Sequence, residues 1–285
     1  MTINKAQVQN NFSQNAITYD QYAVVQKEMA RELLLKIRRT GRDFRNILEI
    51  GCGTGFLTEL LAREYPLAQI TATDISQEMI VVASEKLAGF SNINYFVADG
   101  ENLIANKVSF DPSIDLSFDL IASNAVFQWF TDYTATFTQY HTYLEPGGYL
   151  IYSTLGDGTF KELYVCLKDG QKGKTPGIRS DPKIQNKREP FIGIKHLQEV
   201  MVKAGFQFVG VEEVTKMEYF NSCRSFLRAL KMIGAHNYLT EELGFRGLGS
   251  GIFSLIKRYD ALFLDQRGVP VTYQCLFGRG QRALS

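Results

Sequence analysis

The stretch Glu49-Ile50-Gly51-Cys52-Gly53-Thr54-Gly55 lies between a short apolar run and a longer helical pattern. Residues 45–52 read as a buried strand, and residues 54–65 read as a helix with apolar side chains on one face. Glycines at such a turn permit a tight bend and a close approach of the backbone to a ligand. The stretch therefore predicts a strand–turn–helix unit that meets a bound small molecule.

Short apolar runs and longer helical patterns alternate through the middle of the chain, which is typical of a parallel sheet with helices on both faces. The last strand is not followed by a helix, so we expect it to pair antiparallel to the others. The predicted fold class is α/β, a Rossmann-like, seven-stranded, mostly parallel sheet with an antiparallel last strand. Strands are predicted at 45–52, 69–75, 93–99, 118–125, 149–155, 206–213 and 271–278, and helices at 54–65, 77–87, 133–144 and 195–204.

Three segments, residues 1–40, 157–190 and 221–267, fall outside this alternation, and the 285 residues are interpreted as one domain. The first is predicted to be a helical N-terminal segment. The second follows the fifth strand and the third follows the sixth. Chain that leaves a strand of an open parallel sheet emerges at the carboxyl edge, where ligands bind. We therefore expect both insertions to form lids over the active site.

The glycine spacing G-x-G-x-G differs from the G-x-G-x-x-G of dinucleotide sites, in which a helix N-terminus faces a pyrophosphate. S-adenosylmethionine has no phosphate, and its amino-acid tail and sulfonium cation suit backbone groups and a carboxylate such as Glu49. Three polar residues end the next strands: Asp74 for the ribose hydroxyls, Asp99 for the adenine amine and Asn124 beside the methyl group. Together these features predict an S-adenosylmethionine site made of Glu49, Gly51, Cys52, Gly53, Gly55, Asp74, Ile75, Met79, Asp99, Gly100 and Asn124.

The overall composition is that of an ordinary globular protein, with 45% apolar and 21% charged residues. A formal net charge of +1 argues against a dedicated nucleic-acid binder. The four cysteines and three histidines are scattered, so we expect neither a metal site nor a disulfide framework, and we interpret the cysteines as reduced thiols of a cytoplasmic protein. The polar N-terminus does not resemble a signal peptide, and no apolar stretch is long enough to span a membrane.

Over residues 45–155 the chain resembles the class I S-adenosylmethionine-dependent methyltransferases. The resemblance rests on the glycine turn and on Asp74-Ile75-Ser76, Ala98-Asp99-Gly100 and Leu144-Glu145-Pro146-Gly147-Gly148.

A narrower resemblance, to the malonyl-[acyl-carrier protein] O-methyltransferase family of biotin biosynthesis, extends over nearly the whole chain. It implies formation of a methyl ester on the free carboxylate of a malonyl thioester, with a malonyl-loaded acyl carrier protein or malonyl-CoA as partner. The sequence departs from the family pattern at Phe127, where many members carry Leu. The motifs are Phe12-Ser13, Thr18-Tyr19-Asp20, Ser123-Asn124-Ala125, Gln128-Trp129, Ser153-Thr154-Leu155-Gly156, Leu227-Arg228-Ala229-Leu230-Lys231, Gly234-Ala235-His236-Asn237 and Thr272-Tyr273.

The reaction that this resemblance implies needs no general base, because a carboxylic acid with a pKa near 4 is already ionised at pH 7. Alignment of the reactants and exclusion of water are expected to supply most of the catalysis. Tyr19 is the candidate catalytic residue, since a phenol can orient a carboxylate. The alternative is an ordinary aromatic residue of an amphipathic helix.

Four further residues are candidates for binding the acceptor. Gln128 and Trp129 follow the fourth strand and are expected to line a substrate channel, unless Trp129 belongs to the core. Arg228 and Lys231 share a helix face and could meet the malonyl carboxylate or a phosphate, unless that face is simply solvated. His236 is interpreted as structural.

Both predicted lids, residues 157–190 and 221–267, hold more Lys and Arg than Asp and Glu, although the whole chain is nearly neutral. Carrier proteins are acidic as a class, so the excess positive charge could steer such a partner to the active site. No RNA-binding motif accompanies it.

Three other functions remain open at this stage. The first is a methyltransferase for another acceptor, such as a small polycarboxylate or a quinone ring. A nicotinamide-dependent dehydrogenase is disfavoured by the glycine spacing. A non-catalytic regulator that binds the cofactor is disfavoured because the predicted crevice residues are all present.

Overall fold

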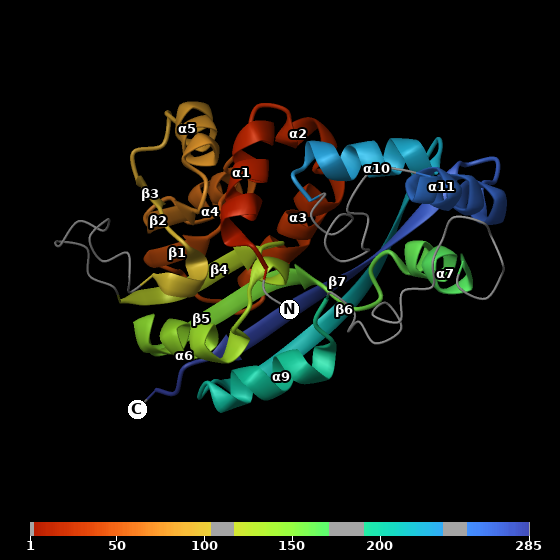
Figure 1. Cartoon of the computed structure of the whole chain (residues 1–285). Coiled ribbons are helices and arrows are strands. Elements are labelled where there is room, and N and C mark those ends of the chain that lie inside the picture. The colour runs from red at the N-terminus through yellow and green to blue at the C-terminus, as the bar shows by residue number, and fades with distance from the viewer. Residues whose placement is uncertain (1–2, 104–116, 171–190, 236–249, 285) are drawn as a thin grey trace.

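The computed structural model describes residues 3–103, 117–170, 191–235 and 250–284, and they build one seven-stranded sheet (Figure 1). The strand order is β3-β2-β1-β4-β5-β7-β6. The five strands from β3 to β5 are parallel, and β7 is antiparallel to both of its neighbours. This confirms the predicted fold class. The strands are β1 Asn46–Ile50, β2 Gln69–Asp74, β3 Ile93–Val97, β4 Phe118–Asn124, β5 Leu144–Leu155, β6 Gln207–Phe220 and β7 Val269–Gln281.

Helices cover both faces of the sheet (Figure 1). On one side lie α3, α4 and α5, with α1 and α2 beside them, and on the other side lie α6 and α9. The helices are α1 Lys5–Asn15, α2 Tyr19–Tyr22, α3 Val24–Arg38, α4 Phe56–Glu64, α5 Gln77–Lys86, α6 Tyr133–Tyr143, α7 Lys161–Gly170, α9 Ile194–Lys203, α10 Cys223–Met232 and α11 Ser250–Phe263, with short 3-10 helices η1 Gly100–Asn102 and η2 Phe127–Trp129.

Three strands are longer than the sequence predicts, and β7, at Val269–Gln281, exceeds its predicted range at both ends. β5 begins at Leu144 rather than at residue 149, because Leu144 pairs with Phe118 before the register shifts at a bulge, where a proline is tolerated. β6 continues seven residues beyond 213, to Phe220, because β7 pairs with it along its whole length. β6 is an edge strand and is half exposed, so its sequence has no continuous run of apolar residues from which its full length could be predicted.

Two large apolar clusters hold the helices to the sheet, one on each face. Phe127 lies at the centre of the cluster beneath α6 and is fully buried. Its ring centroid is 4.7 Å from that of Tyr152, 5.0 Å from Phe130 and 5.3 Å from Phe137. The residue that departs from the family pattern is therefore part of an aromatic core.

The four cysteines are buried free thiols. Among the described residues, no helix combines the length and the hydrophobicity that crossing a membrane requires.

Candidate functional site

The turn after β1 contains glycines that the backbone requires. Gly51, Gly53 and Gly55 all have positive φ angles, of 69°, 55° and 84°, which glycine adopts without strain. A Cβ atom on Gly51 would lie 2.3 Å from Val126 Cγ2, whereas a Cβ atom on Gly53 would meet no atom within 4 Å. Gly53 therefore borders open space, as expected where a backbone approaches a ligand.

Asp74, at the end of β2, is tied to this turn. The backbone N–H of Gly53 donates to Oδ2 of Asp74 at 2.9 Å, and that of Ser76 donates to Oδ1 at 2.8 Å. Burial raises the pKa of Asp74 to about 6, against the opposing effect of these hydrogen bonds. The carboxylate is thus held in place and retains lone pairs for a ligand.

Glu49, on β1, is only 1% exposed. Its Oε2 atom has no hydrogen-bond partner among the described residues. Burial raises the pKa of this carboxyl to about 8. A buried carboxyl oxygen without a partner is costly unless a ligand or water satisfies it.

A cavity of about 680 Å³, here called the first cavity, opens at the carboxyl ends of β1 to β4. Trp129 lines it, and so do eight of the predicted cofactor residues: Gly51, Gly53, Asp74, Ile75, Met79, Asp99, Gly100 and Asn124.

The other three predicted cofactor residues, Glu49, Cys52 and Gly55, do not line the first cavity. Glu49 and Cys52 line a third cavity of about 380 Å³ beneath the turn, together with Gly51, Gly53 and Asn124. Gly55 lines neither cavity. It precedes α4 as the N-cap residue, and a Cβ atom there would lie 2.9 Å from Leu87 Cδ1.

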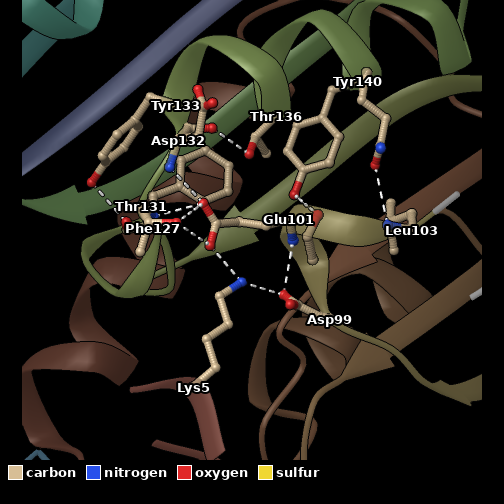
Figure 2. Close-up of polar contacts among 12 residues, drawn as sticks. Lys5, Asp99, Glu101, Leu103, Phe127, Thr131, Asp132, Tyr133, Thr136 and Tyr140 are labelled. Atoms are coloured by element: carbon tan, nitrogen blue, oxygen red, sulfur yellow. Dashed lines mark hydrogen bonds and ion pairs between the residues drawn. The ribbon is translucent and has the colours of Figure 1, made fainter. Parts of the chain in front are cut away.

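Asp99 forms an ion pair with Lys5, a residue that was not predicted to belong to the site. Nζ of Lys5 lies 2.5 Å from Oδ1 of Asp99 and 2.5 Å from Oε2 of Glu101 (Figure 2). The Glu101 side chain is 7% exposed, and its Oε1 accepts from the backbone N–H groups of Thr131 at 2.6 Å and Asp132 at 2.7 Å. Lys5 therefore connects α1 to the ends of β3 and η2.

Two more side chains of α1 bind the same edge of the sheet. Nε2 of Gln9 donates to the carbonyl oxygen of Ile75 at 2.8 Å, and Oγ of Ser13 lies 2.9 Å from Oγ of Ser76. With Lys5 these residues are spaced four apart, so they share one helix face. Val8 and Phe12 of α1 also line the first cavity. The i, i+4, i+8 spacing was visible in the sequence, but its partners were not.

Tyr19 lies where three cavities meet. It lines the first cavity, the third cavity and a second cavity of about 400 Å³, which includes residues of α10 and β7. Burial raises the pKa of its phenol, and the nearby carboxylates of Asp74 and Asp20 raise it further. Tyr19 is therefore a neutral hydrogen-bond donor at ordinary pH.

Asn124, at the end of β4, is fixed by the protein on both sides of its amide. Its Nδ2 donates to the carbonyl oxygen of Gln26 at 3.0 Å, and its Oδ1 accepts from Oγ of Ser153 at 2.7 Å. The next residue, Ala125, has φ of 55°. A non-glycine residue with positive φ is uncommon and is often found at functional sites.

The predicted acceptor residues fall into two groups. Trp129 lines both the first and the second cavity and packs edge to face on Phe12 at 5.6 Å, and Gln128 lines the second cavity. Arg228 and Lys231 are exposed on α10 and line none of the three cavities. Leu227 and Leu230 form the buried face of that helix. The predicted structural residue His236 lies outside the described residues.

The charges around the first and third cavities suit a cation. Three aspartates line them, Asp20, Asp74 and Asp99, against two lysines, Lys5 and Lys27. Glu49 also lines the third cavity, but its raised pKa of about 8 leaves it mostly protonated at neutral pH. Both lysines are paired with acids, Lys27 with Asp20 at 3.4 Å. A cationic ligand with hydroxyl and amine groups fits this set.

Comparison with known proteins identifies the family. Residues 48–150 match a family model described as a methyltransferase domain. The malonyl-[acyl-carrier protein] O-methyltransferase of Priestia megaterium is 35% identical over 96% of this chain and 96% of its own length. The enzyme of the same name from Bacillus anthracis is 32% identical over 96% of each chain. This chain belongs to the malonyl-[acyl-carrier protein] O-methyltransferase family.

Solved structures agree on the fold. The YcgJ protein of Bacillus subtilis is 16% identical, with a TM-score of 0.55 over 89% of this chain and 99% of that one. A Haemonchus contortus phosphoethanolamine N-methyltransferase, solved with S-adenosylhomocysteine, is 18% identical, with a TM-score of 0.51 over 89% of this chain and 52% of that one. A malonyl-[acyl-carrier protein] O-methyltransferase needs a donor site beside an acceptor site, and in this chain Tyr19 lines both the first and the second cavity.

Proposed function

We propose that this protein transfers the methyl group of S-adenosylmethionine to the free carboxylate of a malonyl-loaded acyl carrier protein, forming a methyl ester for biotin biosynthesis. The observation that supports this best is the junction of the first and second cavities. Phe12, Tyr19, Ala125 and Trp129 line both. A donor in one cavity and an acceptor in the other would meet at these four residues.

The first and third cavities are proposed to hold the cofactor. Asp74 offers its remaining lone pairs to ribose hydroxyls, and Gly53 leaves room for the amino-acid tail. Asp99 borders the adenine end, and the orphaned Oε2 of Glu49 offers an acceptor to a positive group. When bound, the cofactor supplies an electrophilic methyl group.

The chain itself orients the acceptor and excludes water. The acceptor carboxylate is ionised at neutral pH, so no residue needs to remove a proton. The neutral Tyr19 phenol donates a hydrogen bond that orients the carboxylate without neutralising it. Phe12 and Trp129 keep water from the junction, which strengthens each electrostatic contact there.

The carrier protein is proposed to dock near the exposed basic residues of α10. Arg228 and Lys231 remain proposed contacts for that partner or for its phosphate. Of the basic residues predicted in the lids, those in 171–190 and 236–249 lie outside the described residues. The proposal places the reaction in the cytoplasm, with malonyl-CoA as an alternative methyl acceptor.

The direct test is incubation with methyl-labelled S-adenosylmethionine and malonyl-loaded carrier protein. We expect a labelled product that releases its label as methanol in base, since an ester is base-labile. Acetyl-loaded carrier protein, which lacks the carboxylate, is the matched control. Equal labelling of both proteins, or of neither, would overturn the proposal. A quinone or a free polycarboxylate as the labelled product would favour the alternative acceptors.

A further inference from the structure

The wall of the second cavity is uncharged. None of the described residues that line it is an Asp, Glu, Lys, Arg or His. Its polar groups are two tyrosines and two glutamines, among aromatic and aliphatic side chains. The four are Tyr19, Gln26, Gln128 and Tyr273.

The cations of the neighbouring cavities are already engaged. Lys5 is held between two carboxylates, and Nζ of Lys27 donates to the carbonyl oxygen of Asp20 at 2.7 Å. Arg228, on α10, is exposed to solvent. Within the described part of the chain, an anion in the second cavity therefore meets uncharged hydrogen-bond donors.

Two of the residues that carry uncharged donors line the third cavity as well as the second. Gln26, on the first turn of α3, lines both the second and the third cavity, and Tyr19 lines both as well. Within the described residues, neither the Gln26 amide nor the Tyr19 hydroxyl has a hydrogen-bond partner. The backbone of Gln26 is anchored, because its carbonyl oxygen accepts from Nδ2 of Asn124.

The other glutamine of the cavity is committed to the protein. Nε2 of Gln128 donates to the carbonyl oxygen of Ala125 at 2.6 Å, and its Oε1 accepts from Thr154 at 3.1 Å. Gln128 is 7% exposed and shapes the wall. Gln26 is thus the better placed of the two amides to bind a ligand.

We propose that Gln26 binds the carboxylate of the methyl acceptor together with Tyr19, and that the uncharged second cavity selects acceptors with one carboxylate on a neutral arm. This inference rests on the proposed function and names the residue that recognises its substrate. An arginine here would pair tightly with the carboxylate and mask the attacking oxygen. Amide and phenol donors orient it and leave its charge available.

The same wall excludes a second charge. Free malonate is a dianion at neutral pH, and both of its carboxylates would have to enter the site. The second one would be buried without a counter-ion, which is costly. A malonyl thioester presents only one carboxylate, because its other end is an uncharged acyl-thioester arm.

The test measures binding rather than turnover. The enzyme is saturated with sinefungin, an unreactive cofactor analogue, and its affinities for malonyl-loaded and acetyl-loaded carrier protein are measured by calorimetry. The ratio of the two dissociation constants isolates the contribution of the carboxylate. We expect Gln26→Leu to reduce this ratio about tenfold, the effect of losing one hydrogen bond to a charged group. Gln21→Leu, at an exposed position on α2, is the matched control and should preserve the ratio.

Gln26 also borders the third cavity, so the folding of Gln26→Leu is checked without ligand, and its thermal unfolding midpoint should stay within about 5 °C of the wild type. If that variant does not fold, the nearly isosteric Gln26→Glu replaces it, and its added negative charge should abolish the preference for the malonyl group. Free malonate should compete at least about 100-fold more weakly than the malonyl thioester.

An unchanged ratio in both Gln26 variants, or free malonate binding as tightly as the thioester, would overturn the inference alone. A wild-type protein that does not distinguish malonyl from acetyl carrier protein and forms no methyl ester would overturn the proposed function, and the inference with it.

Discussion

Lys5 and Asp99, 94 residues apart in the chain, form an ion pair of 2.5 Å that joins the first helix to the end of β3 (Figure 2). The same ammonium group lies 5.4 Å from the centroid of the Phe130 ring. Together with Gln9 and Ser13, this pair holds α1 against the edge of the sheet where the first cavity opens.

Replacing Lys5 with Met should loosen α1 and weaken cofactor binding. The pair is partly exposed, so we expect a loss on the order of 1 kcal/mol, about fivefold in affinity. Calorimetry with S-adenosylhomocysteine measures it, and hydrogen exchange should become faster in residues 5–15. Lys195→Met, at an exposed site on α9, is the control. Unchanged exchange in α1 would show that the ion pair does not hold the helix.

Replacing Tyr19 with Phe should lower kcat by about tenfold or more, because one hydrogen bond to the acceptor carboxylate is lost. Cofactor affinity should change much less, since the ring that lines the cavities remains. Steady-state kinetics and a separate binding measurement distinguish the two effects. Unchanged turnover would remove Tyr19 from the mechanism.

Cofactor affinity should rise with pH between about pH 5 and pH 7. The pKa of Asp74 is raised to about 6 by burial, so the carboxyl is protonated below that pH and ionised above it. Only the ionised form attracts a cationic cofactor, and each pH unit below the pKa should cost up to about tenfold in affinity. Asp74→Asn should bind more weakly and flatten this profile, whereas Glu85→Gln, an exposed control on α5, should not. A flat wild-type profile would contradict the assignment.

Glu49→Gln should stabilise the protein without cofactor at pH 9. Burial raises the pKa of Glu49 from 4.5 to about 8 in the folded state, so the folded state binds its proton more tightly than the unfolded state does. The stability of the wild type therefore falls as pH rises from about 4.5 to 8. At pH 9 the variant lacks this buried charge, and its free energy of unfolding should exceed that of the wild type by about 1–3 kcal/mol. Urea unfolding at pH 6 and pH 9 measures this, and an equal difference at both pH values would refute it.

Reversing the charges of Arg228 and Lys231 should weaken the use of malonyl-loaded carrier protein. Both residues are exposed on α10, where they can attract an acidic partner. The Arg228→Glu, Lys231→Glu double variant should raise KM several-fold for the carrier protein and reduce its salt dependence. Kinetics at low and high salt, compared with malonyl-CoA as substrate, provide the measurement. If neither parameter changes, this face is only solvated surface.

The alternation of strands and helices and the antiparallel last strand could be predicted from local sequence patterns, because apolar periodicity is a local property. The sequence also placed Gly51, Asp74, Asp99 and Asn124 at one edge of the sheet. The structure agrees, since parallel strands present their carboxyl ends on the same side. The order of the parallel strands is enough to predict that these residues lie close together.

The residues outside the sheet that meet that edge are set by long-range packing, which becomes visible only in the folded chain. Lys5 and Gln26 lie on helices whose docking depends on contacts with β3, β4 and η2, distant in the chain. The orientation of α10 likewise turned Leu230 toward the second cavity and Arg228 toward solvent. Helical periodicity predicts that such residues share or oppose a face, but the face that is buried is set by the packing partner, which the local sequence does not specify.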